Sequence, residues 1–161
     1  MRRTLRAGVV LLTIGVAIAG CVDDDLSVKT DIHQELLKAV NDLRSTGCQC
    51  GQDWIPAVQP VTWNDTLEQV AYDHAYDMYT NNYFSHLSRD GTPPITRALQ
   101  AGYRGIYVGE NMAKGYSNVH DVMQGWIASE SHCKNLMDTI YLEVGGARVS
   151  GYWVLDFGRS E

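Results

Sequence analysis

Three side chains that could carry acid–base or metal chemistry lie in short polar segments of the second half of the chain. His86 follows Tyr-Phe-Ser and precedes a Ser-Arg-Asp-Gly turn, His132 lies in Ser-Glu-Ser-His-Cys, and Glu110 lies in Gly-Glu-Asn. Two imidazoles and a carboxylate can hold a divalent cation such as zinc, or form an acid–base pair. Spacing alone does not bring the three together, so this chemistry is a hypothesis that the fold must support.

The remaining histidines indicate structural positions. His33 and His120 have polar neighbours in predicted helices, which indicates surface residues. His74 lies on the apolar face of a predicted helix, between Ala71 and Met78. We expect it to be a buried histidine with one hydrogen bond rather than a ligand, because buried polar groups are generally paired.

The elements that would position these side chains follow from the spacing of apolar residues and from helix start and stop signals. We predict helices at 28–45, from Asn64 or Asp65 (with Asp65 and Glu68 as a capping box), from Pro93 to Gly102, from a Ser117 cap, and at 131–137. The tail is rich in β-branched and aromatic residues, which predicts a hairpin of 141–149 and 152–157, with a further short strand near 106–108. Helices first and strands last favour an α+β layered domain.

The start of the chain is typical of an exported protein. Three arginines precede an uncharged run at 7–20, which is a signal-peptide pattern too short to span a membrane. Ile-Ala-Gly-Cys at 18–21 resembles a bacterial lipobox, so we expect 1–20 to be removed and Cys21 to be acylated. Stable anchoring needs more than one acyl chain, which this modification supplies. Ordinary secretion with an unmodified Cys21 is the alternative.

This assignment divides the chain into a signal peptide at 1–20, an acylated and acidic tether at 21–30, and one domain at 31–159. Val22 after the lipidated position suggests outer-membrane sorting if the source is Gram-negative. The chain has 13 Lys and Arg against 19 Asp and Glu, and loss of the three signal arginines leaves a net charge of −9. Because phosphate binding depends on clustered basic residues, we expect no nucleic-acid partner.

Three cysteines remain once Cys21 is assigned to lipid. In an oxidising compartment we expect one disulfide and one spare thiol. Only one residue separates Cys48 from Cys50, so either could reach Cys133, whereas a bond between the two would be strained. Bridging to Cys133 would close a long loop, worth roughly 4–5 kcal/mol. Zinc is the competing interpretation, but the double-pair spacing of zinc sites is missing.

Several motifs in fixed order carry a resemblance to a known family. They are YFSH (83–86), AGY (101–103), GENMAKG (109–115), a Trp at 126 followed by SESHCKNLMD (129–138), EVGGARV (143–149) and GYWVLDFG (151–158). Together they resemble the bacterial branch of the CAP superfamily, which comprises the cysteine-rich secretory, antigen 5 and pathogenesis-related proteins and is also called the SCP domain. The resemblance covers about 31–158.

The resemblance implies a three-layer α–β–α sandwich with a small, mainly antiparallel central sheet and a cleft. In many members the cleft holds two histidines and two glutamates that can bind a divalent cation such as zinc. By motif, the matching residues here are His86, His132 and Glu110. The second glutamate position is Ser129, and Glu130 beside it is turned by about 100° on a helix. We therefore expect weaker metal binding, with zinc held by three side chains and a water.

The resemblance also implies the disulfide pairing. The segment RSTGCQCG (44–51) is similar to the one whose cysteine pairs with the cysteine after the motif histidine. Its Cys-Gly dipeptide favours Cys50 as the partner of Cys133. Cys48 is then left as a thiol with no assigned role.

Three functions are compatible with these motifs. The one we favour is a non-catalytic, membrane-anchored binding module outside the cytoplasm, with a lipid, sterol-like or protein ligand. The alternatives are a metal-assisted hydrolase or protease using the same cleft, and a structural envelope lipoprotein with a vestigial cleft. The chain has no HExxH helix and no Gly-x-Ser-x-Gly elbow. Ser85 and Ser131 adjoin histidines in sequence only, so we expect binding rather than catalysis.

Overall fold

The computed structural model describes residues 24–160, so the predicted signal peptide and the acylation of Cys21 lie outside the described residues. In this part of the chain the helices are α1 (Asp24–Thr46), α2 (Asp65–Thr80), α3 (Pro94–Gln100), α4 (Val119–Ala128) and α5 (Glu130–Met137). The strands are β1 (Cys48–Cys50), β2 (Asp53–Ile55), β3 (Thr62–Trp63), β4 (Gly105–Lys114), β5 (Glu143–Val149) and β6 (Tyr152–Ser160). Over residues 24–160 no helix combines the length and the apolar character needed to span a bilayer.

The central sheet has the order β3-β5-β6-β4. Strands β5 and β6 form the predicted hairpin, whose turn residues Ser150 and Gly151 have φ of 46° and 85°. Positive φ at both central residues gives a turn whose twist matches that of the paired strands. Strand β4 lies antiparallel to β6, and the short β3 lies parallel to β5. The expectation of a small, mainly antiparallel sheet is confirmed.

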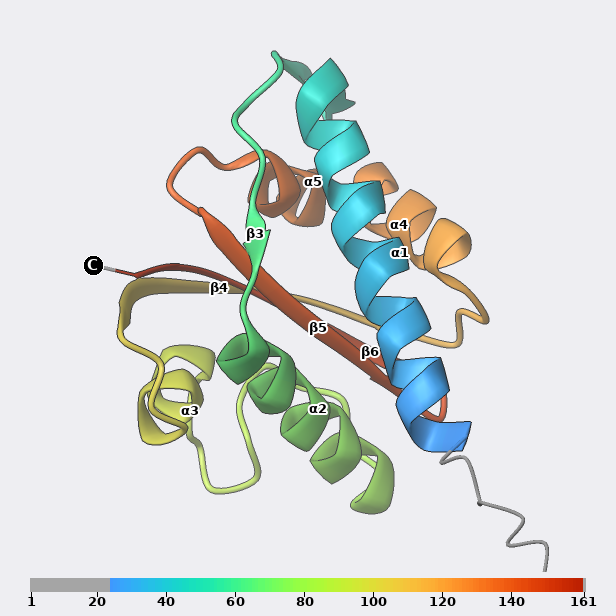
Figure 1. The fold of residues 1–161 in the computed structure, drawn as a ribbon, viewed down its shortest axis with the longest axis vertical. Helices are drawn as coiled ribbons and strands as arrows, with labels where there is room; N and C mark the ends of the chain where they lie inside the picture. The colour runs from blue at the N-terminus through green and yellow to red at the C-terminus, as the bar shows by residue number, and fades with distance from the viewer. Residues whose placement is uncertain (1–23, 161) are drawn as a thin grey trace, which may run out of the picture.

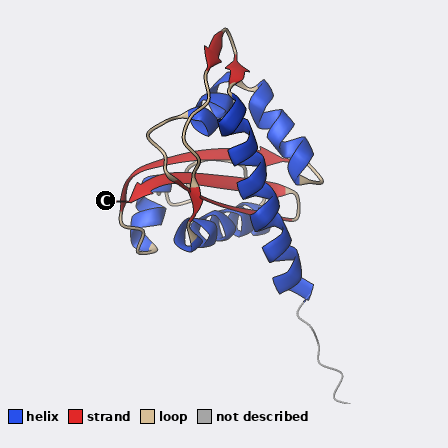
Figure 2. Ribbon diagram, turned by 45° about the horizontal axis from the view of Figure 1, so that its top comes forward, coloured by secondary structure: helices blue, strands red, loops and turns tan. Residues whose placement is uncertain are grey.

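Helices cover both faces of this sheet (Figures 1 and 2). Side chains of α1, α4 and α5 pack on one face, against Val144, Trp153, Leu155 and Phe157. Helix α2 packs on the other face, against Met112, Ala147 and Val154, and α3 packs against α2. Alternate residues of a strand point to opposite faces, so each strand contributes to both cores. The predicted three-layer α–β–α sandwich is confirmed.

Three local predictions differ from the structure at helix starts. Helix α1 begins at Asp24, before the predicted start at 28, and so includes part of the acidic tether expected at 21–30. No Gly or Pro lies between Asp24 and Thr46, so no residue in this range breaks the helix. The N-cap of α2 is Asn64, whose Oδ1 accepts the amides of Thr66 and Leu67, so the capping box at Asp65 is wrong.

The start of α4 also differs by one residue. Its N-cap is Asn118 rather than Ser117, and the Asn118 Oδ1 accepts the backbone N–H of Asp121 at 2.9 Å. Strand β4 extends over ten residues, far beyond the short strand expected near 106–108. Its Gly, Glu and Asn residues have low β propensity, so pairing along β6 rather than local preference sets its length.

A buried arginine fastens α1 to the loops beside it. Arg44 is fully buried, and its guanidinium donates to the backbone carbonyls of Gln59, Leu136, Asp138 and Tyr141 at 2.8–3.2 Å. Because these carbonyls come from two segments, the loop before β3 and the stretch from the end of α5 to Tyr141, one side chain fixes how those segments pack on α1. Burial lowers the pKa of Arg44, and the charge of Asp138 opposes that effect.

Candidate functional site

The site is built around Glu110, which lies in the edge strand β4. Glu110 and Asn111 point to opposite faces of the sheet: Glu110 toward α3, and Asn111 toward α5. The Glu110 side chain is only 1% exposed. The Gly-Glu-Asn motif therefore places one carboxylate inside the layer formed by α2 and α3, and one amide inside the opposite layer.

Both oxygens of the Glu110 carboxylate are paired. Oε1 accepts from Nδ1 of His86 at 2.5 Å, and Oε2 accepts from Nη2 of Arg97 at 2.5 Å. Arg97 lies on α3 and is 11% exposed, whereas the His86 side chain is 53% exposed. The result is a buried carboxylate, a mostly buried guanidinium and an imidazole that faces solvent.

The loop that carries His86 is held on both sides of that residue. Nε2 of His74 lies 2.9 Å from the carbonyl oxygen of Ser85, and Nη1 of Arg97 donates to the carbonyl of His86 at 2.8 Å. Arg97 also donates to the carbonyl of Thr92 at 3.2 Å. These contacts fix the imidazole before any ligand arrives, which reduces the ordering cost of binding.

Glu110 sets the protonation of His86. Its hydrogen bond raises the pKa of His86, burial lowers that pKa, and the charge of Glu110 raises it further while that of Arg97 opposes it. Because a carboxylate accepts at Nδ1, the ring presents Nε2 to solvent. An oriented imidazole of this kind can accept or donate a hydrogen bond, act as a base, or ligate a metal.

Asp156 is a functional-site candidate that the sequence reasoning missed. It pairs with Glu110 across the β4–β6 ladder, is fully buried, and neither of its carboxylate oxygens has a hydrogen-bond partner in the described structure. Burial raises the pKa of Asp156 well above its usual value, and the nearby charge of Glu110 raises it further. Both influences favour the protonated, neutral form of Asp156. The sequence feature that could have indicated Asp156 is a single acidic residue between Leu155 and Phe157 in an otherwise apolar strand.

The histidine predictions have mixed outcomes. His74 is buried with one hydrogen bond, as expected, and burial lowers its pKa. His120 is exposed, as expected. His33 is not a simple surface residue, because it is partly buried and stacks on Trp63 with ring centroids 4.0 Å apart.

His132 approaches the site from the opposite layer, on α5. Burial lowers the pKa of His132, and the charge of His86 lowers it further. Beneath them, Nδ2 of Asn111 donates to the carbonyl of His132, and Nδ2 of Asn135 donates to Oδ1 of Asn111. Asn111 thus has a structural role, joining β4 to α5.

Ser129 and Glu130, at the position where the family pattern has its second glutamate, do not join Glu110. Ser129 is the N-cap residue of α5, with its Oγ 3.4 Å from Oγ of Ser131. The exposed Glu130 accepts from Lys134 at 2.7 Å and lies against Gly51 in the β1–β2 turn. The side chain of Glu130 therefore belongs to the surface near the disulfide, and it does not complete a tetrad.

The described residues offer no ready metal site in the cleft. Among them, the only group of three or more His, Cys, Asp or Glu whose ligand atoms all lie within 4.8 Å of one another is Cys48, Cys50 and Cys133. A dication at Glu110 would also have to displace the guanidinium of Arg97 from Oε2. Zinc binding by His86, Glu110 and His132 stays a prediction, and the residues as placed do not favour it.

A cavity of about 260 Å³ adjoins this cluster between α2, α3 and the loop after His86. Its lining includes His74, Arg97 and three carboxylates, those of Asp73, Asp77 and Asp90. Asp77 also accepts a hydrogen bond from the hydroxyl of Tyr83. Three carboxylates against one guanidinium give the cavity an acidic character, which favours ligands with a cationic or hydrogen-bond-donating group.

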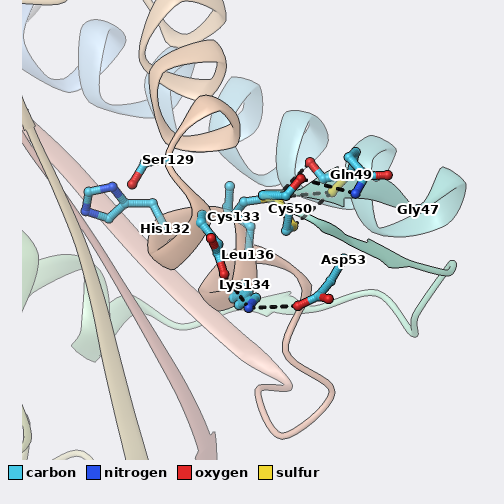
Figure 3. The surroundings of a disulfide bond; sticks show 12 residues. Gly47, Gln49, Cys50, Asp53, Ser129, His132, Cys133, Lys134 and Leu136 are labelled. Atoms are coloured by element: carbon cyan, nitrogen blue, oxygen red, sulfur yellow. Dashed lines mark hydrogen bonds and ion pairs between the residues drawn. A yellow bond between two sulfur atoms is a disulfide. The ribbon is translucent and has the colours of Figure 1, made fainter.

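The disulfide joins Cys50 to Cys133, with their Cα atoms 5.4 Å apart, and this is the pair that the motif resemblance implies. It links β1 to α5, the helix that carries His132, and the ring of His132 points away from the disulfide (Figure 3). Cys48 is a free, buried cysteine. The bridge therefore braces the element that presents one of the two cleft histidines.

The fold and the site together define an α–β–α sandwich that carries a cluster of His86, Glu110 and Arg97 at an edge strand. The CAP family, described as the cysteine-rich secretory protein family, matches residues 37–157 of this chain. The chain belongs to that family.

Individual relatives cover different shares of the chain. The uncharacterized membrane protein YlbC of Bacillus subtilis is 32% identical over 95 residues, which is 59% of this chain and 28% of that protein. An extracellular SCP-domain protein of Bacillus anthracis has a TM-score of 0.73 and 25% identity, covering 88% of this chain and 45% of that one. An outer surface protein of Borrelia burgdorferi shares the fold at a TM-score of 0.66 and 22% identity, covering 86% of this chain and 95% of that one. The chain thus matches about a quarter of the curated relative and just under half of the Bacillus anthracis structure.

Proposed function

We propose that this protein is an exported, membrane-anchored binding module whose ligand is recognised at the His86 cleft. The observation that carries the proposal is the full pairing of Glu110 by His86 and Arg97, which leaves the outward edge of an oriented imidazole as the reactive feature of the site. A carboxylate with both oxygens occupied is poorly placed to activate water. The same carboxylate is well placed to hold an imidazole for recognition.

The surroundings of His86 support a ligand with both apolar and polar parts. Phe84 and Leu87 on the same loop are about half exposed, and the acidic cavity adjoins Arg97. Exposed apolar side chains beside a few fixed polar groups are typical of binding sites for small molecules and lipids. A lipid or sterol-like molecule is therefore our first candidate ligand, and a protein segment is the second.

The anchor follows from the lipobox at Cys21. Relatives that carry the words membrane protein, extracellular protein and outer surface protein in their names support an envelope location. Changing Cys21→Ser should release the protein from the membrane fraction and abolish labelling with a radioactive or clickable fatty acid. Retained labelling would remove the lipoprotein assignment and leave the cleft proposal intact.

The test of binding uses the full chain purified from its own membrane in detergent. Mass spectrometry of the extracted protein should find a lipid retained at about one molecule per chain, and His86→Ala should lose it. The matched control is His120→Ala, an exposed histidine on α4. Equal ligand content in both variants would overturn the assignment of the site.

A metal-assisted hydrolase is the second candidate, because an imidazole oriented by a carboxylate can also act as a base. It requires zinc uptake that is lost in the double variant His86→Ala with His132→Ala, and turnover of a peptide or ester substrate that is lost in Glu110→Ala. Zinc uptake unchanged by the double variant would exclude His86 and His132 as ligands. Absence of turnover across a broad substrate panel would leave binding as the better account.

A further inference from the structure

Three cysteine sulfurs meet at the end of the molecule where β1 contacts α5. Sγ of Cys48 lies 3.3 Å from Sγ of Cys133 and 3.5 Å from Sγ of Cys50. Cys48 and Cys50 are two residues apart on β1, with both side chains buried and Gln49 exposed between them. Successive residues of a strand alternate in direction, so both thiols face Cys133.

The walls of this sulfur cluster (Cys48, Cys50 and Cys133) are apolar. The fully buried Met137 belongs to the same cluster of buried residues, and Leu43, Ile55 and Val58 pack against it. The charged groups nearby form ion pairs at the exposed surface, where Lys134 contacts Asp53 and Glu130 (Figure 3). The Cys48 side chain is therefore enclosed by the disulfide sulfurs and by apolar side chains.

We propose that reduction of the Cys50–Cys133 bond converts the sulfur cluster into a Cu(I) site. A dithiol reductant supplies two electrons and two protons, the sulfur–sulfur bond breaks, two thiols form, and the reductant leaves as its own disulfide. Cu(I) then binds the thiolates of Cys48, Cys50 and Cys133, and the thiol protons are released to solvent. The disulfide and the copper complex are therefore mutually exclusive states of the same sulfurs.

The donor set selects a soft cation. Thiolate and thioether groups favour Cu(I) over hard ions, which need oxygen ligands. Zn(II) in closed protein sites takes four ligands at tetrahedral positions, with metal–sulfur bonds of about 2.3 Å. Three thiolates in an aliphatic pocket satisfy the low coordination number of Cu(I) without a fourth donor. Three sulfurs placed trigonally at bonds of about 2.3 Å lie about 4 Å from one another, so the two sulfur–sulfur contacts of Cys48 would lengthen by roughly 0.5–0.7 Å.

The experiment uses the full chain in detergent with Cys21→Ser, so that the three clustered cysteines are its only thiols. The protein is reduced with a dithiol, freed of it under argon, and titrated with Cu(I) against bicinchoninate, a coloured competing ligand. The reduced protein should take up one Cu(I) per chain and the oxidised protein none. X-ray absorption should show sulfur as the only class of ligand.

Cys48→Ser is the decisive variant because it keeps the disulfide pair. It should weaken Cu(I) binding by roughly 100-fold or more, since loss of even an outer-shell partner costs about 10–100-fold. Gln49→Ala, an exposed neighbour on β1, should bind as the parent does. Equal binding by Cys48→Ser, or stronger binding of Zn(II) than of Cu(I), would overturn the proposal.

Circular dichroism keeps the test informative if reduction unfolds the chain. Restoration of the folded spectrum by one equivalent of Cu(I) would support the site, and a chain that stays unfolded with Cu(I) would overturn it. None of these outcomes depends on the ligand of the His86 cleft. A failure here would leave the proposed binding function untouched.

Discussion

The two faces of the central sheet present different kinds of side chain, although the same strands form both. Toward α1, α4 and α5, strand β6 presents Trp153, Leu155 and Phe157 to a continuous apolar core. Toward α2 it presents Val154 and then Asp156, beside Glu110 of β4. One face is an ordinary hydrophobic core, whereas the other places two carboxyl groups and a guanidinium where water is largely excluded.

This difference indicates that the face toward α2, which carries the candidate site, contributes less to stability than the apolar face. Apolar burial stabilises the fold at every contact, whereas a buried charge is tolerated only when it is paired. Glu110 is paired by Arg97 and His86. The raised pKa of Asp156 favours its neutral form, which carries no buried charge. The apolar face thus holds the scaffold, and the charged face holds an imidazole in a fixed direction at the surface.

The largest effect should come from a cavity in the apolar face. Trp153→Ala removes a side chain that is 1% exposed and whose indole N–H donates to the carbonyl of Tyr116. We expect a loss of about 3–5 kcal/mol in the free energy of unfolding, measured by urea denaturation. Trp54→Ala is the control, since that side chain is 62% exposed and should change stability by less than about 0.5 kcal/mol. Similar losses in both variants would contradict this account of the core.

The charged face should respond to loss of pairing rather than to loss of volume. Arg97→Met keeps an aliphatic side chain but leaves the Glu110 carboxylate without its guanidinium, and we expect a loss of about 3 kcal/mol. In the Glu110→Gln background the same substitution should cost much less, because no buried charge is left unpaired. A double-mutant cycle by urea denaturation measures the difference. Additive losses would show that the two side chains are not coupled.

Asp156 should make stability depend on pH in a direction opposite to that of a paired carboxylate. The pKa of Asp156 is higher in the folded protein than in the unfolded chain. The contribution of Asp156 to the free energy of unfolding is therefore fully present below the ordinary aspartate pKa. That contribution is lost as pH rises toward the folded value. Asp156→Asn should therefore become more stable relative to the parent as pH increases, by at most about 1.4 kcal/mol per pH unit. Urea unfolding between pH 4 and pH 8 measures it, and parallel profiles would contradict a protonated Asp156.

The sequence predicted the scaffold better than the charged face. Periodic apolar residues and turn signals located the helices and the β5–β6 hairpin, because those features are local. Strand β4 was under-predicted because Gly109, Glu110 and Asn111 adopt strand geometry only through pairing with β6. The motifs indicated His86, Glu110 and His132 as candidate site residues, but not what each of them contacts.

Arg97 and Asp156 were missed for a physical reason. Arg97 lies in a short helix where an arginine would ordinarily be solvated, and its ion pair with Glu110 exists only because α3 packs beside β4. Asp156 lies in a strand whose apolar neighbours dominate the pattern. In both cases the function of the residue is set by a neighbour distant in sequence, which no local pattern encodes.

The smallest and most local effect concerns the imidazole itself. Glu110→Gln replaces the carboxylate at Nδ1 of His86 with a neutral amide, so the pKa of His86 should fall from its raised value toward that of an ordinary histidine. Nuclear magnetic resonance titration of the ring protons measures the shift, with the exposed His120 as an internal reference in the same spectra. Because Arg97 and burial both oppose protonation of His86, losing Glu110 removes the influence that raises its pKa most. An unchanged pKa of His86 would mean that Glu110 does not orient the ring in solution. The charged face would then not hold the imidazole in a fixed direction.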